Sequence, residues 1–295
     1  IYAHQKQSNM ELEQYLNQHL AVSTVKRYQR EINLYHEYLK ARNQTAAQAS
    51  YNDVMEYIGH LRKHQNSIAC GLHGVKKYYE YLVASGRRKD NPSKSIRLRD
   101  RPSRDIQLQD FFTTQELEQL LERKQRYSLL INRNKLIISL LIYQGLTNGE
   151  IKRLELKDID LEQGTIYIKQ GTRTNRRTLK LESKQVYWLM NYIEKDRTQL
   201  LKVKSEKLII SKLGSEENGE GISYLIETMR SKFPDRKLNP KTIRQSVIAN
   251  LLKQGKDLRL VQAFAGHKYP STTERYKQYQ VEDLKKEVLK YHPLG

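Results

Sequence analysis

The chain lacks the features that mark secreted, disulfide-bonded and membrane-spanning proteins. It has a single cysteine among 295 residues, Cys70, which excludes an intramolecular disulfide and a cysteine-rich zinc site. No apolar run approaches the roughly 18 residues that a membrane-crossing helix needs. The segment Ile1–Met10 has no apolar core like that of a signal peptide. We therefore expect a soluble, cytoplasmic protein.

Acidic residues are scarce relative to basic ones. The chain has 33 Asp and Glu against 53 Lys and Arg, which gives a formal net charge of +20. A surplus of this size favours a nucleic-acid partner, because each phosphate neutralised by Lys or Arg releases a condensed counterion. On charge alone, a basic protein without a polyanionic partner remains the alternative.

The positive charge is densest between Arg87 and Arg104. This stretch contains eight basic and two acidic residues, together with Pro92 and Pro102. Because proline interrupts helices, the stretch predicts a basic linker between two globular halves. Such a linker suits a clamp that closes around a nucleic-acid duplex.

The length predicts two domains, at roughly 100–200 residues for each. The first half reads as helical and the second half as mixed. The expected divisions are an N-terminal arm or non-native remnant over 1–9, a helical domain over 10–98, a basic linker over 99–110, a second domain over 111–280 and a C-terminal helix or tail over 281–295.

Apolar residues at spacings of three and four predict helices throughout the first half. The first of them carries its apolar face over Val25–Leu39. Ser23 or Thr24 is its expected N-cap, because a hydroxyl can accept a hydrogen bond from the first turn. Two further helices are expected, one from about Ser50 and one over Ile68–Leu82.

The second half combines a predicted β-hairpin with helices. The two strands lie within Asp158–Lys169 and Arg177–Leu181 and are joined by a turn. Thr113–Glu116 has the pattern of a capping box at a helix start. Further helices are expected at Gln185–Leu201, Ser223–Phe233, Thr242–Leu252, Asp257–Ala265 and Val281–Tyr291.

Nothing in the sequence points to a metal or a nucleotide cofactor. No segment matches a glycine-rich phosphate loop, a His-Glu-x-x-His zinc motif or an EF-hand. His60 and His64 could share one helix face, but two ligands rarely suffice for a metal site. We therefore expect no metal and no cofactor.

Three segments of the second half stand out together. They are Tyr143–Leu154 (YQGLTNGEIKRL), Lys241–Arg244 (KTIR), and Gly266-His267 with Tyr276 nine residues after the histidine. In these segments the chain resembles the tyrosine recombinase, or phage integrase, family. Members carry a T-G-L-R-x-x-E segment, a hairpin lysine, an H/K-x-x-R segment and a G-H segment followed by a tyrosine. The resemblance extends over essentially the whole chain and points loosely to transposon-borne cointegrate resolvases of the TnpI type.

The resemblance implies a mainly α fold with two domains. A helical, SAM-like core-binding domain would precede a mixed α/β, mostly helical catalytic domain with a small β-hairpin or sheet. The protein would be a bacterial, DNA-associated recombinase without a cofactor. It would bind a double-stranded recombination site as a homodimer and synapse two sites as a homotetramer. Integration, excision or cointegrate resolution would proceed through a 3′-phosphotyrosyl intermediate and a Holliday junction.

The resemblance also assigns roles to individual residues. Tyr276 would be the covalent nucleophile, and the phosphotyrosine would conserve the bond energy so that religation needs no ATP. Arg244 would hold the non-bridging oxygens of the phosphate, and His267 would hydrogen-bond the same phosphate or help to deprotonate the tyrosine. Lys241 would be a further phosphate ligand. Glu150 would support the site without reacting.

Two positions depart from the family pattern. Thr147 stands where the family has its first arginine, and a short neutral hydroxyl cannot replace a cation with five donors. Thr172 stands where the family has its hairpin lysine. Compensation by another cation, an inactivating substitution and a slow or accessory enzyme are the three explanations, of which we favour compensation. The cations near these positions are Lys152, Arg153, Lys169, Arg173 and Arg176.

Basic residues outside the site are expected to contact DNA phosphates. One set belongs to the first helix of the N-terminal half, and the other to the stretch that ends at Arg104. They are Lys26, Arg27 and Arg30, and Arg87, Arg88, Lys89, Arg97, Arg99, Arg101 and Arg104.

Several alternatives remain open at this point. A catalytically impaired member could act as a DNA-binding or architectural protein, and a type IB topoisomerase would share the chemistry while relaxing single sites. Tyr279 is the alternative nucleophile. The helix Val281–Tyr291 could dock onto a neighbouring subunit or fold back onto its own domain.

Overall fold

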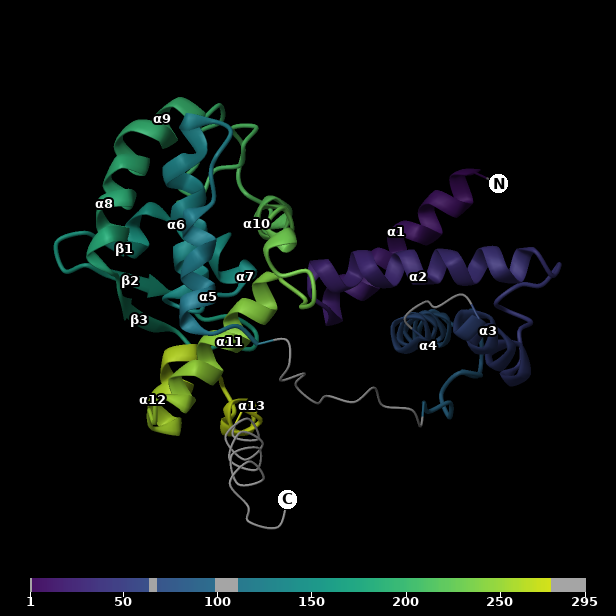
Figure 1. Ribbon diagram of the computed structural model, residues 1–295. Coiled ribbons are helices and arrows are strands. Elements are labelled where there is room, and N and C mark those ends of the chain that lie inside the picture. Colours follow the sequence, from purple (N-terminus) through teal and green to yellow (C-terminus); the bar gives the residue numbers. More distant parts are fainter. Residues whose placement is uncertain (1, 64–67, 99–110, 277–295) are drawn as a thin grey trace, which may run out of the picture. The chain divides into compact units, whose positions relative to one another are not determined.

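The computed structural model describes residues 2–63, 68–98 and 111–276 (Figure 1). The chain divides into two compact units, Ile1–Ser103 and Arg104–Gly295. The predicted linker over 99–110 and the predicted tail over 281–295 lie outside the described residues. The predicted arm over 1–9 differs from the structure, because its residues from Tyr2 onward belong to the first helix.

In the described residues of the N-terminal unit, the regular secondary structure is helical. Among them, α2 packs against α1 and α4, and α3 packs against α4. The predicted apolar face of α2 is confirmed, since Val25, Ile32 and Leu39 are all buried in the core. The bounds are α1 Tyr2–His19, α2 Val22–Lys40, α3 Tyr51–Lys63 and α4 Ile68–Ala84.

The start of α2 corrects one prediction. The N-cap is Ala21, and it makes no side-chain capping bond, whereas we expected Ser23 or Thr24. The carbonyl of Ala21 accepts hydrogen bonds from the N–H groups of Thr24 and Val25. Because α1 ends at His19, helical hydrogen bonding resumes at the first available turn, and the hydroxyl residues fall inside the helix.

Tyrosines form the centre of this unit. Tyr35, Tyr57 and Tyr79 are fully buried, and the hydroxyl groups of Tyr35 and Tyr79 lie 2.8 Å apart in a hydrogen bond. Such a bond offsets the cost of burying a hydroxyl, whereas the buried Tyr57 hydroxyl has no hydrogen-bond partner among the described residues. Most of the aromatic surface in this unit therefore serves folding.

The first part of the predicted linker is also folded onto this core. Ile96 is buried among the apolar residues of the N-terminal unit. The Arg88 Nη1 atom donates to the carbonyl of Ala46 at 2.7 Å, and its guanidinium stacks on the Tyr79 ring. The interpretation of all of Arg87–Arg104 as a linker was therefore wrong for residues 87–98.

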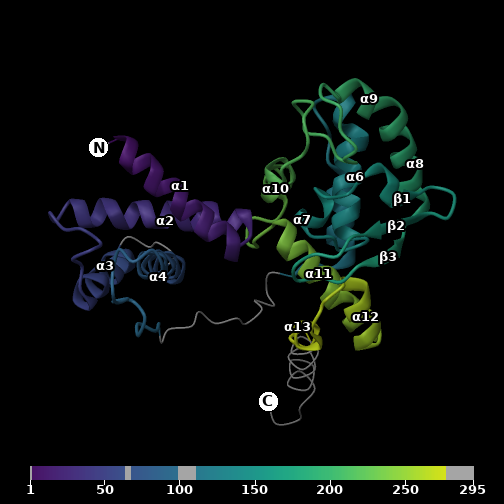
Figure 2. The ribbon, with the colours of Figure 1, turned by 180° about the vertical axis from the view of Figure 1, so that it is seen from behind.

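The second unit surrounds the apolar helix α6 (Ile131–Ile142). Leu136, Leu140 and Leu141 are fully buried, and α6 packs against α8 and α11. Figures 1 and 2 both show α12 and α13 together at one end of this unit, next to α11. The remaining bounds are α5 Thr114–Glu118, α7 Asn148–Ile151, α8 Ser183–Asn191, α9 Arg197–Leu200, α10 Glu220–Glu227, α11 Pro240–Lys253, α12 Leu258–Ala265 and α13 Pro270–Glu274.

A small antiparallel sheet lies within this unit. Its order is β1 (Ile159–Asp160), β2 (Thr165–Ile168), β3 (Arg177–Lys180). The predicted hairpin is confirmed as β2 and β3, with Ile168 opposite Arg177. The single strand expected within Asp158–Lys169 is two strands, because the chain reverses at Gly164, which has a positive φ of 60°.

The helices that follow the sheet match the predictions in place but not in detail. The helix expected at Gln185–Leu201 consists of α8, a π-helical turn η5 (Tyr192–Asp196) and α9. The helix expected at Ser223–Phe233 is α10, which begins earlier, at Glu220, and ends at Glu227; a separate 3₁₀ turn, η6 (Arg230–Lys232), follows it. The short helix α13 was not predicted.

Candidate active site

Thr147 has a clear local role at the start of α7. Its N–H and hydroxyl both donate to Glu150 Oε2, at 2.8 and 3.0 Å, and Glu150 N–H donates to the Thr147 hydroxyl at 3.1 Å. These bonds form a capping box, in which the side chains of the N-cap and of the third helical residue satisfy each other's backbone. The threonine thus fixes the glutamate in place but brings no charge.

Glu150 lies between two arginines. Its Oε1 atom accepts from Arg177 Nη1 at 2.7 Å, and its Oε2 atom lies 3.7 Å from Arg244 Nη1. All three side chains are nearly inaccessible to solvent. Burial alone would raise the pKa of Glu150, but the bond and charge of Arg177, the Thr147 backbone and the charge of Arg244 hold it below its usual value. The carboxylate is therefore ionised and shared by two cations.

Arg244 is held by two backbone carbonyls. Its Nη1 atom donates to Gly145 O at 2.5 Å and its Nη2 atom to Ala265 O at 2.6 Å. It lies in the first turns of α11, where Asn239 is the N-cap. Lys241 lies three residues earlier and is exposed, so the two side chains share one helix face.

His267 follows the end of α12 and is buried. Its Nδ1 atom lies 2.9 Å from the Thr273 hydroxyl, which leaves Nε2 for a ligand. Burial and the charges of Arg244 and Arg177 lower the pKa of His267 to about 4. The ring is therefore neutral near pH 7.

The turn between β2 and β3 contacts Gly266 and His267. Asn175 N–H donates to Gly266 O at 2.7 Å, and Thr174 forms an isolated β-bridge with His267. A Cβ atom on Gly266 would lie 2.6 Å from Arg177 Nη1, so only glycine allows this approach. Its φ of +69° independently favours glycine.

Tyr276 is also buried. It packs in an apolar cluster with Phe111 and Ile248. Burial raises the pKa of its hydroxyl, while the charge of Arg244 and a hydrogen bond with Gln245 act in the opposite direction. The tyrosine that the resemblance marks as nucleophile is thus within electrostatic range of Arg244.

The structure brings together Arg244, His267, Glu150, Thr147 and Tyr276, but not the cations that we considered as substitutes. Lys169 Nζ is bonded to Glu155 at 2.5 Å and lies 3.3 Å from Asp158. Thr172, Arg173 and Arg176 are exposed on the hairpin turn, and Arg153 lies against Gly171 in the same turn.

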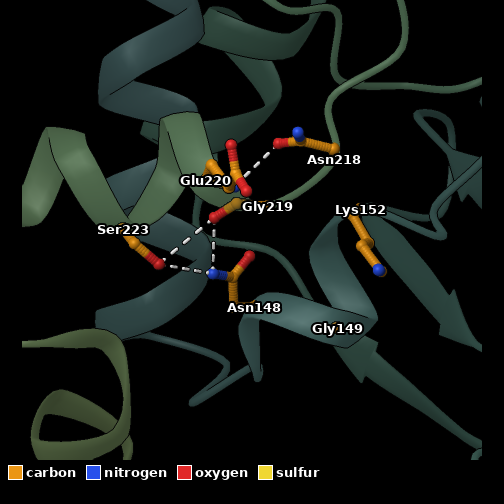
Figure 3. Close-up of a pocket in the computed structure, with 7 residues that line it drawn as sticks. All are labelled: Asn148, Gly149, Lys152, Asn218, Gly219, Glu220 and Ser223. Atoms are coloured by element: carbon orange, nitrogen blue, oxygen red, sulfur yellow. Dashed lines mark hydrogen bonds between the residues drawn. The ribbon is translucent and has the colours of Figure 1, made fainter. Parts of the chain in front are cut away.

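Lys152 faces a separate surface pocket of about 490 Å³ (Figure 3). This pocket lies between α7 and the start of α10. Asn148 crosses it, donating to Gly219 O at 2.7 Å and to the Ser223 hydroxyl at 2.9 Å. The Lys152 ammonium is therefore on the pocket side of α7, and the Glu150 carboxylate is in the buried cluster.

The predicted DNA contacts lie in different surroundings. Lys26, Arg27, Arg30, Lys89 and Arg97 are exposed. Arg87 forms an ion pair with Glu11 at 2.5 Å, whereas the Arg88 side chain is only 11% exposed and supports the fold. Arg99, Arg101 and Arg104 lie outside the described residues.

Sequence reasoning missed Arg177, Thr273 and Gln245. A signal for Arg177 existed, because side chains alternate across a strand and Arg177 shares its face with Leu179 in β3. Nothing in the sequence marks Thr273 or Gln245. Among the described residues, no group of three His, Cys, Asp or Glu side chains is placed to hold a metal ion. Within the same residues, no helix is both long and apolar enough to cross a membrane.

Two protein families match the chain. The phage integrase family matches residues 110–283, and the phage integrase N-terminal SAM-like domain matches residues 11–86. The first match covers more than half of the chain and includes every residue of the buried cluster.

Curated relatives cover nearly the whole chain. Tyrosine recombinase XerD of Oceanobacillus iheyensis is 27% identical over 282 residues, which is 93% of each chain. Tyrosine recombinase XerC of the same organism is 25% identical over 92% of this chain and 90% of its own.

Solved structures share the fold. The XerH site-specific recombinase bound to its difH substrate before cleavage has a TM-score of 0.68 and 22% identity, covering 88% of this chain and 78% of its own. The Tn1549 transposon integrase in complex with circular intermediate DNA has a TM-score of 0.64 and 15% identity, over 93% of this chain and 99% of its own.

Proposed function

Because the chain belongs to the phage integrase family of tyrosine recombinases, we propose that Tyr276, Arg244, His267 and Lys241 form its catalytic site. The protein is a site-specific DNA recombinase. The observation that most supports the site is the buried cluster of Arg244, Glu150 and His267, with Tyr276 within reach of the Arg244 charge.

The proposed reaction begins with attack by the Tyr276 oxygen on the scissile phosphorus. A 3′-phosphotyrosine bond forms, the bond to the 5′-oxygen breaks, and the 5′-hydroxyl is released. The proton of the tyrosine passes to His267 Nε2, because Nδ1 is engaged by Thr273. The departing 5′-oxygen takes up a proton from water, since Thr172 stands where the family has its lysine. The freed hydroxyl then attacks the partner strand and yields a Holliday junction.

The charges of the site match the developing transition state. Arg244 is pre-oriented by two carbonyls and needs no reorganisation when the phosphate gains charge. Glu150 neutralises part of the arginine charge while the site is empty. The bound phosphate raises the pKa of His267 and so strengthens the ring as a base.

The partners of the chain follow from the same assignment. The XerH and lambda integrase structures hold DNA recombination sites, and the latter shows a dimer on a core site. We propose that this chain binds its double-stranded site as a dimer and synapses two sites as a tetramer. The proposed site could serve integration, excision or cointegrate resolution equally well. The likeness to TnpI-type resolvases stays a prediction.

An apolar groove offers a place where subunits can meet. It has a volume of about 150 Å³ and lies between α5, α6, α11 and α12. We propose that the tail segment 281–295 of a neighbouring subunit covers this groove. Its apolar residues Leu284, Val288 and Tyr291 recur at the spacing of one face of a helix. Deleting residues 281–295 should abolish the tetramer on paired sites, measured by gel mobility, and leave binding to single sites. A tetramer that survives the deletion contradicts docking in trans.

A trapping experiment tests the catalytic assignment. A binding site is first selected from random DNA duplexes. The selected duplex is then nicked beside the cleavage position. After cleavage the short fragment diffuses away, so the covalent adduct cannot religate. We expect a covalent protein–DNA band on a denaturing gel, and no band with Tyr276→Phe. Strong, salt-sensitive binding without a band would support the non-catalytic, DNA-binding alternative instead. Relaxation of plasmids that lack the site would support the topoisomerase alternative.

A further inference from the structure

Arg177 combines deep burial with unused hydrogen-bonding capacity. Its side chain is 6% exposed, and its Nη1 atom donates to Glu150. Its Nε and Nη2 atoms are buried and have no hydrogen-bond partner among the described residues. An unpaired buried donor is costly, and more so on a charged group, so a ligand that pairs with this edge would be favoured.

Arg133 shows what a structural arginine looks like in the same unit. It is also buried and also paired with a glutamate, Glu217, at 2.7 Å. Its Nε donates to Ile210 O at 2.5 Å and its Nη1 to Asn134 Oδ1 at 2.8 Å. All three of its nitrogens are thus satisfied by the protein.

The guanidinium of Arg177 lies at the proposed catalytic cluster. Nη1 is in contact with Gly266, next to His267, and the charge of Arg177 acts on both His267 and Arg244. Two buried arginines therefore share one glutamate, which leaves a net positive charge beside a neutral histidine. A buried charge without a counter-charge is strongly unfavourable, and an anion at this point would restore the balance.

We propose that Arg177 is a phosphate-binding catalytic residue that supplies the positive charge missing at Thr147. Nη1 stays with Glu150, while Nε and Nη2 hold a non-bridging oxygen of the scissile phosphate. The Nε–Nη2 edge presents two parallel N–H groups, the geometry in which arginine binds phosphate oxygens. This inference rests on the proposed function, because it assumes that a DNA phosphate enters the cluster.

In this chain the second positive charge at Glu150 comes from strand β3 and not from the start of α7. Thr147 is occupied by capping α7, so the cation enters from β3 and meets Glu150 on its other oxygen. Arg177 directly follows the hairpin turn, which is held to Gly266 through Asn175 N–H.

The test compares charged and neutral phosphates in the nicked duplex. Arg177→Gln should lower the rate of covalent adduct formation about 10²–10³-fold on the natural phosphate. On a methylphosphonate at the cleavage position, which carries no negative charge, the deficit relative to the unsubstituted chain should shrink to less than about 10-fold, because no charge needs compensation. Arg133→Gln is the matched control and should show the same rate per folded molecule as the unsubstituted chain on both substrates.

A second variant guards against simple misfolding. Thr147→Arg combined with Arg177→Gln should recover at least about 10-fold of the lost rate, because the new guanidinium starts beside Glu150. A deficit for Arg177→Gln that is equal on both substrates, together with no recovery by Thr147→Arg, overturns the proposal and makes Arg177 structural. If the unsubstituted chain forms no adduct at all, the proposed function itself fails and this inference fails with it.

Discussion

The two buried arginine–glutamate pairs of the second unit differ in one respect. Arg133 makes a hydrogen bond through each of its nitrogens, whereas Arg177 makes one bond and leaves one edge unpaired within the described part of the chain. Both pairs are buried to a similar degree. The degree of burial therefore does not distinguish these two pairs, but the number of satisfied donors does.

The same comparison explains how an enzyme of this family can lack an arginine at Thr147. The cluster around Glu150 still contains two arginines, and one of them comes from β3. The charge of a site depends on the position of the guanidinium group in space, and residues from different parts of the chain can place it there. In this chain Thr147 and Glu150 cap α7, and Arg177 in β3 supplies the positive charge.

Removing the acid of the structural pair should have the largest effect on stability. Glu217→Gln leaves Arg133 buried without a counter-charge, and we expect the free energy of unfolding to fall by about 3–5 kcal/mol. Chemical denaturation of the full chain measures this loss. Adduct formation per folded molecule should be unchanged, and a comparable loss of rate would break the distinction between the two pairs.

Acidification should lower the free energy of unfolding through the Glu150 cluster. His267 lies beside this cluster, whereas the Arg133–Glu217 pair has no histidine among its hydrogen-bond partners in the described part of the chain. His267 is held neutral in the folded state with a pKa of about 4, whereas in the unfolded chain it takes up a proton near pH 6.5. Folding stability is therefore full above pH 6.5 and falls as the pH drops from 6.5 to 4, by on the order of 2–3 kcal/mol.

Unfolding midpoints across this pH range measure the effect, with His267→Gln as the control. The difference between the unsubstituted chain and the variant should depend on pH only below about 6.5. Equal pH dependence in both proteins would show that other groups cause the loss.

Removing the Thr147 cap should lower the free energy of unfolding by a smaller amount. Thr147→Ala removes the hydroxyl that accepts from Glu150 N–H, and an N-cap substitution of this kind costs about 0.5–2 kcal/mol. Thr147→Ser keeps the hydroxyl and should retain most of the stability. If both variants unfold like the unsubstituted chain, the cap is not what fixes Glu150.

The exposed cations of α2 extend the comparison to basic side chains at the surface of the N-terminal unit. Replacing Lys26, Arg27 and Arg30 by alanine should weaken DNA binding on all sequences alike. The slope of log affinity against log salt should decrease by about 0.9 for each phosphate that these side chains neutralise. Arg88→Ala should instead destabilise the N-terminal unit. An unchanged salt slope in the triple variant would remove α2 from the DNA interface.

The sequence located most of the helices and the hairpin to within a few residues. Periodicity located the buried face of α2 because Val25, Ile32 and Leu39 recur at helical spacing. It failed at the N-cap of α2, where the short connection from α1 outweighed hydroxyl preference. The pattern of Asp158–Lys169 indicated a turn and one strand, and it missed β1 because that strand has only two residues.

The catalytic cluster could be predicted only in part for a physical reason. Motif spacing identifies residues that share a helix turn, such as Lys241 and Arg244. It does not show that Arg177 in β3 ends at Glu150 in α7, because this meeting depends on the register of β2 and β3 and on the closeness of Gly266. The cations expected as substitutes include Arg176, but the side chain that meets Glu150 belongs to the next residue, Arg177.

The identity of the tyrosine that joins to DNA tests the central assignment most directly. Trypsin cuts after Arg275 and Lys277, so Tyr276 and the alternative nucleophile Tyr279 fall in different peptides. The covalent adduct is digested with nuclease and trypsin, and the peptide that retains a nucleotide is identified by mass spectrometry. We expect the nucleotide on the dipeptide that contains Tyr276. A nucleotide on the peptide beginning at Gln278 would contradict the assignment of Tyr276 as the nucleophile.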